Sequence, residues 1–281
     1  MKCRLYRSFR LTKVLVNLEV GRITEVEWNM HAFERLVLDK NTKELLDAVV
    51  TNHLAAEKAN DLVTGKGCGL TILLHGGPGT GKTLTAECLA ENAHMPLYRM
   101  TCGDLGTDPS QVEKYLESVF HISNTWNCIL LLDEADVFLE ERSLSDLQRN
   151  SLVSIFLRVL EYFSGILILT SDRVGVFDEA LKSRIQLSVH YRSLGRPERR
   201  QIWWNFLDLL KSQNVVDFDE IEDHLDDLAD NVMNGRQIRN TITTARQLAS
   251  YRSMRLNFEI LQSVIQVSSK FDQFLLQARE G

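Results

Sequence analysis

The chain has 281 residues and a formal net charge of −6, from 38 acidic and 32 basic side chains. With 44% hydrophobic residues and only four prolines, its composition is that of a globular protein and excludes collagen-like and wholly disordered classes. The acidic balance provides no domain-wide basic field for nucleic acid. No apolar run reaches the roughly 18 residues that a membrane-spanning helix needs. The sequence therefore carries neither a nucleic-acid nor a membrane signal.

The cysteines and the N-terminal segment bear on the compartment. Five cysteines are scattered without a Cys-x-x-Cys pair, which favours free thiols in a reducing compartment over disulfides or a zinc site. The first 18 residues carry five basic and no acidic side chains, so a mitochondrial transit peptide is an alternative for this segment. Alternating apolar residues from Val14 to Val20 favour a half-buried strand instead. We therefore expect a soluble intracellular protein, cytoplasmic rather than mitochondrial.

The middle of the chain alternates apolar runs with amphipathic stretches. Three short runs, residues 70–74, 128–132 and 165–170, have the character of strands buried in a parallel sheet. Helical periodicity is found between and before them, over residues 44–62, 84–92, 111–120 and 147–163. This alternation predicts right-handed βαβ crossovers, with helices covering both faces of the sheet.

Beyond about residue 194 the strand pattern ends and helical periods dominate. They cover residues 197–210, 221–232, 235–251 and 258 to the end. We therefore divide the chain into a strand-like N-terminal segment (1–28), an α/β core (29–195) and an all-helical domain (196–281).

The first predicted strand runs directly into a glycine-rich segment that fits the P-loop pattern G-x-x-x-x-G-K-[ST]. Its glycines let backbone N–H groups turn inward around phosphate oxygens, and the next helix begins at its positive dipole end. We expect Lys82 to reach the β- and γ-phosphates of a nucleotide and the Thr83 hydroxyl to ligate magnesium. The predicted nucleotide-binding residues are Gly76, Gly77, Pro78, Gly79, Thr80, Gly81, Lys82, Thr83 and Leu84.

The second apolar run ends in two carboxylates, Asp133 and Glu134. They would lie at the carboxyl edge of the sheet, where open α/β sheets bind ligands. Asp133 is predicted to hold magnesium, directly or through water, and Glu134 to deprotonate a water that attacks the γ-phosphate. A capped helix start is the alternative for this acidic pair, but the P-loop some 50 residues upstream favours a catalytic site.

Two segments resemble the Walker A and Walker B motifs of AAA ATPases, members of the AAA+ superfamily: GGPGTGKT and ILLLDEAD. Three others are similar to a fungal group of AAA proteins with a further N-terminal domain: WNMHAFERLVL, LLDEADVFLEERS and FDEALKSRI. The resemblance implies an α/β fold, a P-loop NTPase parallel sheet flanked by helices and followed by a small helical lid. Residues 29–195 would be the nucleotide-binding core, 196–281 the lid and 1–28 the remnant of an upstream region.

The same resemblance implies three further site residues. Asp172 occupies the sensor 1 position, where the family usually has Asn. Because an ionised Asp only accepts hydrogen bonds, Asp172 either acts through water or a protonated form, or slows hydrolysis. Arg184 falls at the position of an arginine finger acting on a neighbouring subunit, a surface arginine being the alternative. Arg236 matches the sensor 2 segment of the lid, although Arg239 lies on nearly the same helix face and both fit a solvated basic face.

The resemblance also bears on assembly and partners. It implies a homo-oligomer, a hexameric ring in the family, that acts on a protein partner still to be identified. Threading members of the family carry an aromatic residue in a pore loop after the second strand. Here Tyr98 would lie in or beside that strand, and the segment from Gly103 to Pro109 has no aromatic residue and only Leu105 as a large apolar one. Threading by a gripping aromatic is therefore not supported.

The expected function is magnesium-dependent binding and hydrolysis of ATP to ADP, coupled to remodelling of a partner. A scaffold that binds ATP and scarcely hydrolyses it is the alternative of a different class, favoured by Asp172 and disfavoured by Glu134. A P-loop phosphotransferase that phosphorylates a small molecule is a third possibility. The Asp133-Glu134 pair, the arginine at position 184 and the long helical region argue against it.

Overall fold

The computed structural model describes residues 26–56, 69–106, 108–139, 146–173, 177–211 and 215–280, with the side chains of 56 and 271–280 left out. These residues form two compact units. The first contains the described residues up to Gly77 together with Gly81–Tyr191, and the second contains Pro78–Thr80 and the residues from Arg192 onward. Most of the predicted N-terminal segment, residues 1–25, lies outside the described residues.

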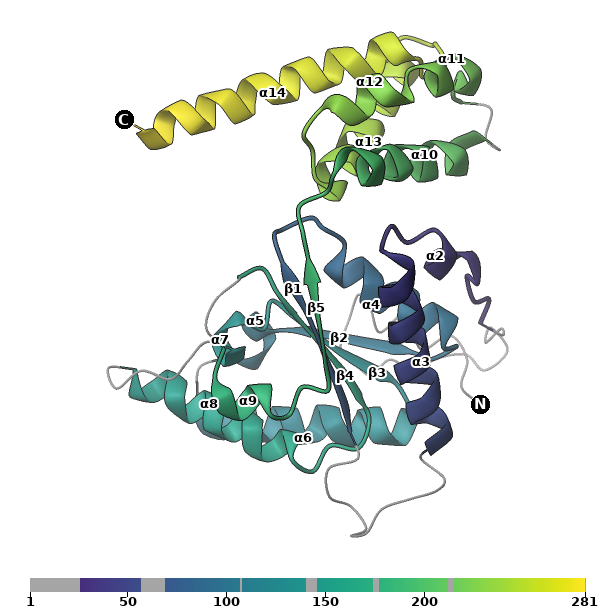
Figure 1. Ribbon diagram of the computed structural model, residues 1–281. Coiled ribbons are helices and arrows are strands. Elements are labelled where there is room, and N and C mark those ends of the chain that lie inside the picture. Colours follow the sequence, from purple (N-terminus) through teal and green to yellow (C-terminus); the bar gives the residue numbers. More distant parts are fainter. Residues whose placement is uncertain are drawn as a thin grey trace. The chain divides into compact units, whose positions relative to one another are not determined.

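The first unit is built on a five-stranded parallel sheet (Figure 1). The spatial order is β2-β3-β4-β1-β5, which confirms the predicted α/β fold with a parallel sheet flanked by helices. The strands are β1 (Leu70–Gly76), β2 (Leu97–Thr101), β3 (Ile129–Asp133), β4 (Ile166–Ser171) and β5 (Leu187–Tyr191). Strands β1, β3 and β4 are the three apolar runs of the sequence, and they occupy the centre of the sheet.

Eight helices have described residues in the first unit, four of them long. They are α2 (His31–Glu34), α3 (Lys40–Ala56), α4 (Lys82–Asn92), α5 (Cys102–Leu105), α6 (Pro109–Trp126), α7 (Asp136–Leu139), α8 (Leu147–Leu160) and α9 (Glu179–Lys182). The long ones agree with the predicted helical stretches. The four-residue helices α2, α5, α7 and α9 were not predicted, because they are too short to show a helical period.

The helices cover both faces of the sheet, and alternate strand residues point to opposite faces (Figure 1). On one face, Leu73 of β1 packs with the buried residues of α6 and α8. On the other face, its neighbours Ile72 and Leu74 pack with those of α3 and α4. Each side chain of this size stabilises the fold by about 1.5–3 kcal/mol when buried. Burial on both faces explains why the central strands are continuous apolar runs.

The second unit is helical (Figure 1). Its helices are α10 (Arg196–Lys211), α11 (Phe218–Asp223), α12 (Leu225–Asp230), α13 (Gly235–Tyr251) and α14 (Phe258–Glu280). Trp203 of α10 is fully buried in its core, against residues such as Ile238 of α13 and Leu261 of α14. Helix α13 starts at a capping box, in which the Asn234 and Gln237 side chains accept from each other's backbone N–H groups at 2.9 Å. Such a cap stabilises a helix start by about 1 kcal/mol.

Within the described residues, no helix is both long and apolar enough to cross a membrane.

Candidate nucleotide-binding and catalytic site

The loop between β1 and α4 needs its glycines. Gly76, Gly79 and Gly81 have φ values of +142°, +72° and +107°, which residues with a side chain rarely adopt. A Cβ atom on Gly76 would lie 2.1 Å from the carbonyl oxygen of Tyr191 in β5. Helix α4 begins at Lys82, directly after Gly81, so its unpaired N–H groups and its dipole face the loop. The segment therefore has the local geometry of a phosphate-binding loop.

Lys82 is buried, with 6% of its surface exposed, and all three of its donors have acceptors. Its Nζ donates to the carbonyl oxygens of Gly76 at 2.8 Å and Gly77 at 2.7 Å. It also lies 2.7 Å from Oδ1 of Asp172, just past the end of β4. The acidic residue at the predicted sensor 1 position thus forms an ion pair with the P-loop lysine. A phosphate bound to Lys82 would have to compete with this carboxylate.

Asp133 ends β3 and is 5% exposed. Its Oδ1 accepts hydrogen bonds from the hydroxyls of Thr83 at 3.0 Å and Thr170 at 2.5 Å. Its Oδ2 lies 2.5 Å from Nη2 of Arg99, on the neighbouring strand β2. A buried carboxylate is costly unless it is paired and hydrogen-bonded, and these three partners meet that requirement.

The oxygens of Thr83 and Asp133 fit a magnesium ion. Magnesium prefers oxygen ligands at about 2.0–2.1 Å in an octahedron, so neighbouring ligands lie about 3 Å apart. The Thr83 hydroxyl and Asp133 Oδ1 are 3.0 Å apart. Magnesium usually takes only one or two carboxylates from the protein and completes its shell with phosphate oxygens and water. The two predicted metal ligands are therefore suitably placed.

Glu134 follows Asp133 directly, and its side chain is exposed at the carboxyl edge of the sheet. Its backbone has a φ of +58°, in the left-handed region. The Glu134 N–H donates to the hydroxyl of Thr170 at 3.0 Å, and its carbonyl accepts from the thiol of Cys102 at 3.0 Å. The next residue, Ala135, donates its N–H to the carbonyl of Thr170 at 2.8 Å. Three hydrogen bonds, two made by Glu134 and one by Ala135, therefore position the backbone that carries the carboxylate predicted to act as a base.

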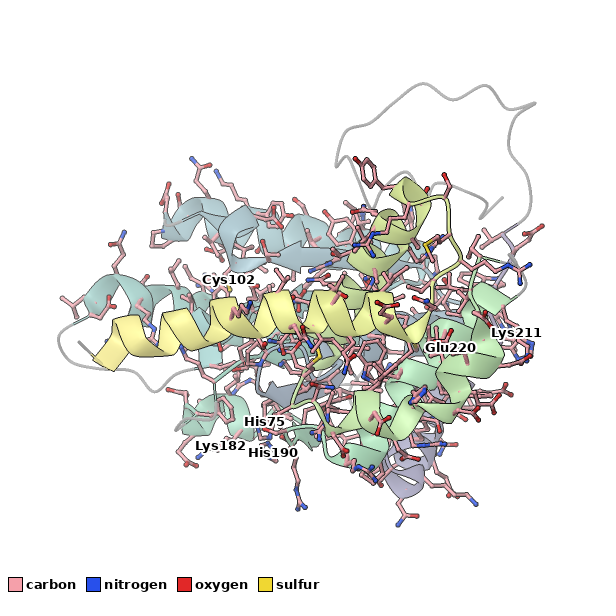
Figure 2. All side chains as sticks on the ribbon, turned by 90° about the horizontal axis from the view of Figure 1, so that it is seen from above. His75, Cys102, Lys182, His190, Lys211 and Glu220 are labelled. Carbon is pink, nitrogen blue, oxygen red and sulfur yellow. The ribbon has the colours of Figure 1, made fainter. Side chains whose placement is uncertain are left out.

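His75, the last residue before the loop, is paired with His190 of β5. Their ring centroids are 4.9 Å apart, and the two residues lie next to each other in Figure 2. Burial, together with His190 and Lys82, lowers the pKa of His75. A neutral imidazole at this position adds no positive charge beside Lys82.

Of the two predicted arginines, Arg184 belongs to the first unit and Arg236 to the second. Arg184 follows α9, donates to the carbonyl of Ala180 at 2.9 Å and lies 3.8 Å from a carboxylate oxygen of Glu161. About a third of its side chain is exposed. Arg236 and Arg239 are both exposed on α13 of the second unit. The contacts of the first unit therefore join Lys82, Thr83, Asp133 and Asp172, with Glu134 adjoining, and do not include either arginine.

Sequence reasoning missed three residues of this arrangement: Arg99, Cys102 and Thr170. None of the three was predicted as a site residue, although Thr170 belongs to the segment that resembles sensor 1, and each contacts a site residue from a different strand or helix. A partial signal was available, because Thr170 ends the predicted strand 165–170 and would lie at the same sheet edge as Asp133. Leu105, the large apolar residue of the segment after β2, is 4% exposed and packs in the core. It is therefore no candidate for gripping a polypeptide.

Comparison with known families agrees with this geometry. The AAA model, for the ATPase family associated with various cellular activities, matches residues 72–193. A model of the fungal AAA+ ATPase lid domain matches residues 194–281. The chain belongs to the AAA ATPases. Its AAA domain contains the P-loop, Asp133, Glu134 and Asp172, and its lid domain contains Arg236.

Similar proteins include ATPase family AAA domain-containing protein 3-B of Xenopus laevis, with 31% identity over 212 residues. That match covers 70% of this chain and 36% of the Xenopus protein. The human protein 3C of the same family is 30% identical over 212 residues, or 70% of this chain and 52% of the human protein. This AAA chain thus spans between about a third and a half of the length of these relatives.

Among solved structures, one chain of the E. coli MS115-1 HORMA:CdnC:Trip13 complex superimposes with a TM-score of 0.60 at 15% identity. The match covers 84% of this chain and 90% of that one. At this identity it supports the AAA fold alone.

Proposed function

We propose that this AAA protein is a magnesium-dependent ATP hydrolase that uses its nucleotide state to remodel a protein partner. The observation that carries the proposal is the contact of the P-loop with Asp133, the first of two consecutive carboxylates. Thr83 of the loop donates to Asp133, and Glu134 follows at the exposed edge of the sheet.

In the proposed mechanism, Lys82 and the backbone N–H groups of the loop bind and orient the phosphates of ATP. Thr83 and Asp133 hold magnesium, which when bound neutralises charge on the phosphate oxygens. Glu134 accepts a proton from the water that attacks the γ-phosphate, and its exposed carboxylate can be reached by that water. Membership in the AAA family and these distances support the roles.

Arg184 and Arg236 are proposed to complete the site in the assembled protein. Arg184 would act on the nucleotide of a neighbouring copy, which requires a homo-oligomer, and a ring is the arrangement the family suggests. The Arg184 side chain is partly exposed, donates to the Ala180 carbonyl and lies 3.8 Å from the Glu161 carboxylate. It is therefore available for this role. Arg236, exposed near the start of α13, would contact the nucleotide of its own subunit.

One observation favours a second function, an ATP-dependent scaffold with little hydrolysis. Asp172 pairs with Lys82, whereas an Asn at the same position could donate to phosphate or to the attacking water. We place hydrolysis first because Glu134 is present and its backbone is fixed by neighbouring residues.

The products formed from Mg-ATP test these functions. Free phosphate and ADP support a hydrolase, whereas a phosphorylated acceptor would show a phosphotransferase. Nucleotide binding without either product would show the scaffold and overturn the hydrolase proposal.

Lys82→Ala tests the phosphate site itself. The change removes the cation expected to bind the β- and γ-phosphates, so ATP binding should be lost in a fluorescent-nucleotide titration. Lys182→Ala is the matched control, because Lys182 is an exposed lysine whose ion pair is with Glu179 of its own helix. Unchanged ATP affinity in Lys82→Ala would contradict the assignment of the phosphate site.

A further inference from the structure

The backbone conformation of Glu134 is unusual for a residue with a side chain. At a φ of +58° it lies in the left-handed region, which costs about 1–2 kcal/mol for residues other than glycine. A conformation of this kind persists where surrounding contacts determine it. It turns the chain sharply between the end of β3 at Asp133 and the start of α7 at Asp136.

Two side chains from different elements form hydrogen bonds with the backbone of Glu134, one with its N–H group and one with its carbonyl. Thr170, which is 2% exposed in β4, accepts from the Glu134 N–H at 3.0 Å. Cys102, the first residue of α5, donates its thiol to the Glu134 carbonyl at 3.0 Å. Both polar groups of the Glu134 backbone are therefore satisfied by side chains rather than by a helix or a strand.

The Cys102 thiol, labelled in Figure 2, is suited to act as a donor. Burial, opposed in part by the Val137 N–H, raises its pKa to about 11, and the carboxylates of Asp136 and Glu134 add to the increase. The thiol therefore keeps its proton at neutral pH. The position of Cys102 is fixed by a capping box at the start of α5, in which Asp104 accepts from the Thr101 N–H at 2.9 Å.

We propose that Cys102 is a positioning residue for the ATPase reaction. Its thiol, with the Thr170 hydroxyl on the other side, holds Glu134 in the left-handed conformation that presents the carboxylate to the attacking water. The inference rests on the proposed role of Glu134 as the base. Among the described residues, the polar contacts of the thiol are with the Glu134 carbonyl and the Val137 N–H, and none is with the P-loop, so we expect it to act on turnover and not on nucleotide binding.

A pair of substitutions at one position tests this role. Cys102→Ala removes the donor, and kcat should fall about three- to tenfold, the value of one neutral hydrogen bond. The KM for ATP and the affinity for a fluorescent ATP analogue should stay within twofold of the wild type. Cys102→Ser keeps a donor at the same position and should recover most of the lost kcat. Equal kcat values for the Ala and Ser variants, or a loss confined to nucleotide affinity, would overturn the proposal.

Glu134→Gln, measured beside these variants, separates this inference from the proposed function. Normal turnover in Glu134→Gln would show that Glu134 is not the base, and would overturn both the proposed function and the role of Cys102. Loss of turnover in Glu134→Gln together with normal kcat in Cys102→Ala would overturn the role of Cys102 alone.

If Cys102→Ala does not fold, Thr170→Val and Thr170→Ser replace it, with circular dichroism as the check of folding. Thr170 donates to Asp133 as well as accepting from Glu134, so Thr170→Val should lower both kcat and the affinity for magnesium-bound nucleotide. Thr170→Ser, which keeps the hydroxyl, should retain both. If kcat in Thr170→Val equals that in Thr170→Ser, the hydrogen bonds to the Glu134 backbone do not position the base, and the proposal is contradicted.

Discussion

At the scale of the residue, one acidic side chain sets the electrostatics of the phosphate site. Lys82 lies between two loop carbonyls and the carboxylate of Asp172. The carbonyls determine the position of the Lys82 ammonium group. The Asp172 carboxylate neutralises its positive charge, which would otherwise attract a phosphate. Asp172 is nearly half exposed, so solvent screens its interaction with Lys82 and the competition is moderate.

Asp172→Asn should therefore raise the affinity for ATP. The change removes the competing charge and keeps the size of the side chain. Because the Asp172 carboxylate is nearly half exposed and screened by solvent, we expect a gain in affinity of roughly two- to fivefold. Titration with a fluorescent nucleotide at two salt concentrations measures it, and the gain should shrink at high salt. An affinity that is unchanged or lower would show that Asp172 does not compete with phosphate for Lys82.

At the scale of the element, β5 supports the helix that follows the P-loop. The phenol of Tyr191 donates to the Thr85 hydroxyl of α4 at 2.6 Å, and that hydroxyl donates to the carbonyl of Gly81 at 3.0 Å. Burial raises the pKa of Tyr191, so the phenol stays protonated as a donor. The last strand thus contributes to the geometry of the loop, although it lies at the edge of the sheet.

Tyr191→Phe removes only this hydrogen bond. We expect unfolding free energy to fall by about 0.5–1.5 kcal/mol, which corresponds to a decrease of a few degrees in Tm for a domain of this size. Thermal unfolding followed by circular dichroism measures it. Tyr162→Phe is the control, since Tyr162 is 66% exposed. Equal melting temperatures for the two variants would mean that the bond to Thr85 contributes nothing to stability.

The same element shows what the sequence could and could not predict. Strands β1, β3 and β4 are buried on both faces, so each appears as a continuous apolar run and was predicted. In β5 only Val189 and Tyr191 are buried, and the exposed residues Ser188 and His190 alternate with them, so no such run exists. The strand is recognised only once its pairing with β1 is known.

The candidate site also has a part that the sequence predicts and a part that it does not. The P-loop and the acidic pair are contiguous motifs, so their types and spacing predicted both their positions and their chemistry. The contacts made by Arg99, Cys102 and Thr170 depend on strands that neighbour β3 in space, and a single sequence does not state which strands those are. The pairing of Asp172 with Lys82 was missed for the same reason, although Asp172 itself was identified by resemblance.

At the scale of the whole molecule, the proposed role of Arg184 requires one copy of the chain to act on the nucleotide of another. Within the described residues, the Arg184 side chain makes one hydrogen bond, to the Ala180 carbonyl, and its backbone bond to Leu181 is kept in a variant, so the fold should tolerate removal of the side chain. Arg184→Ala should lower turnover by about 10³-fold or more, as expected for an arginine finger, and leave ATP binding intact. Measured phosphate release and a nucleotide titration test both parts.

Mixing variants shows whether the arginine acts between subunits. Arg184→Ala retains Glu134, and Glu134→Gln retains Arg184, so a mixed assembly contains complete sites. Phosphate release should therefore reappear when the two inactive variants are combined. Failure to recover turnover in demonstrably mixed oligomers would exclude action of Arg184 between subunits.

Hydrolysis of ATP by this AAA protein, with Glu134 as the base, is the proposal on which the other roles depend. Steady-state phosphate release at saturating Mg-ATP, compared between the wild type and Glu134→Gln, tests it most directly. We expect phosphate release by the wild type, and turnover at least about 10²-fold lower in Glu134→Gln with ATP binding preserved. Equal turnover in the two proteins, or ATP binding by the wild type without release of phosphate, would contradict it.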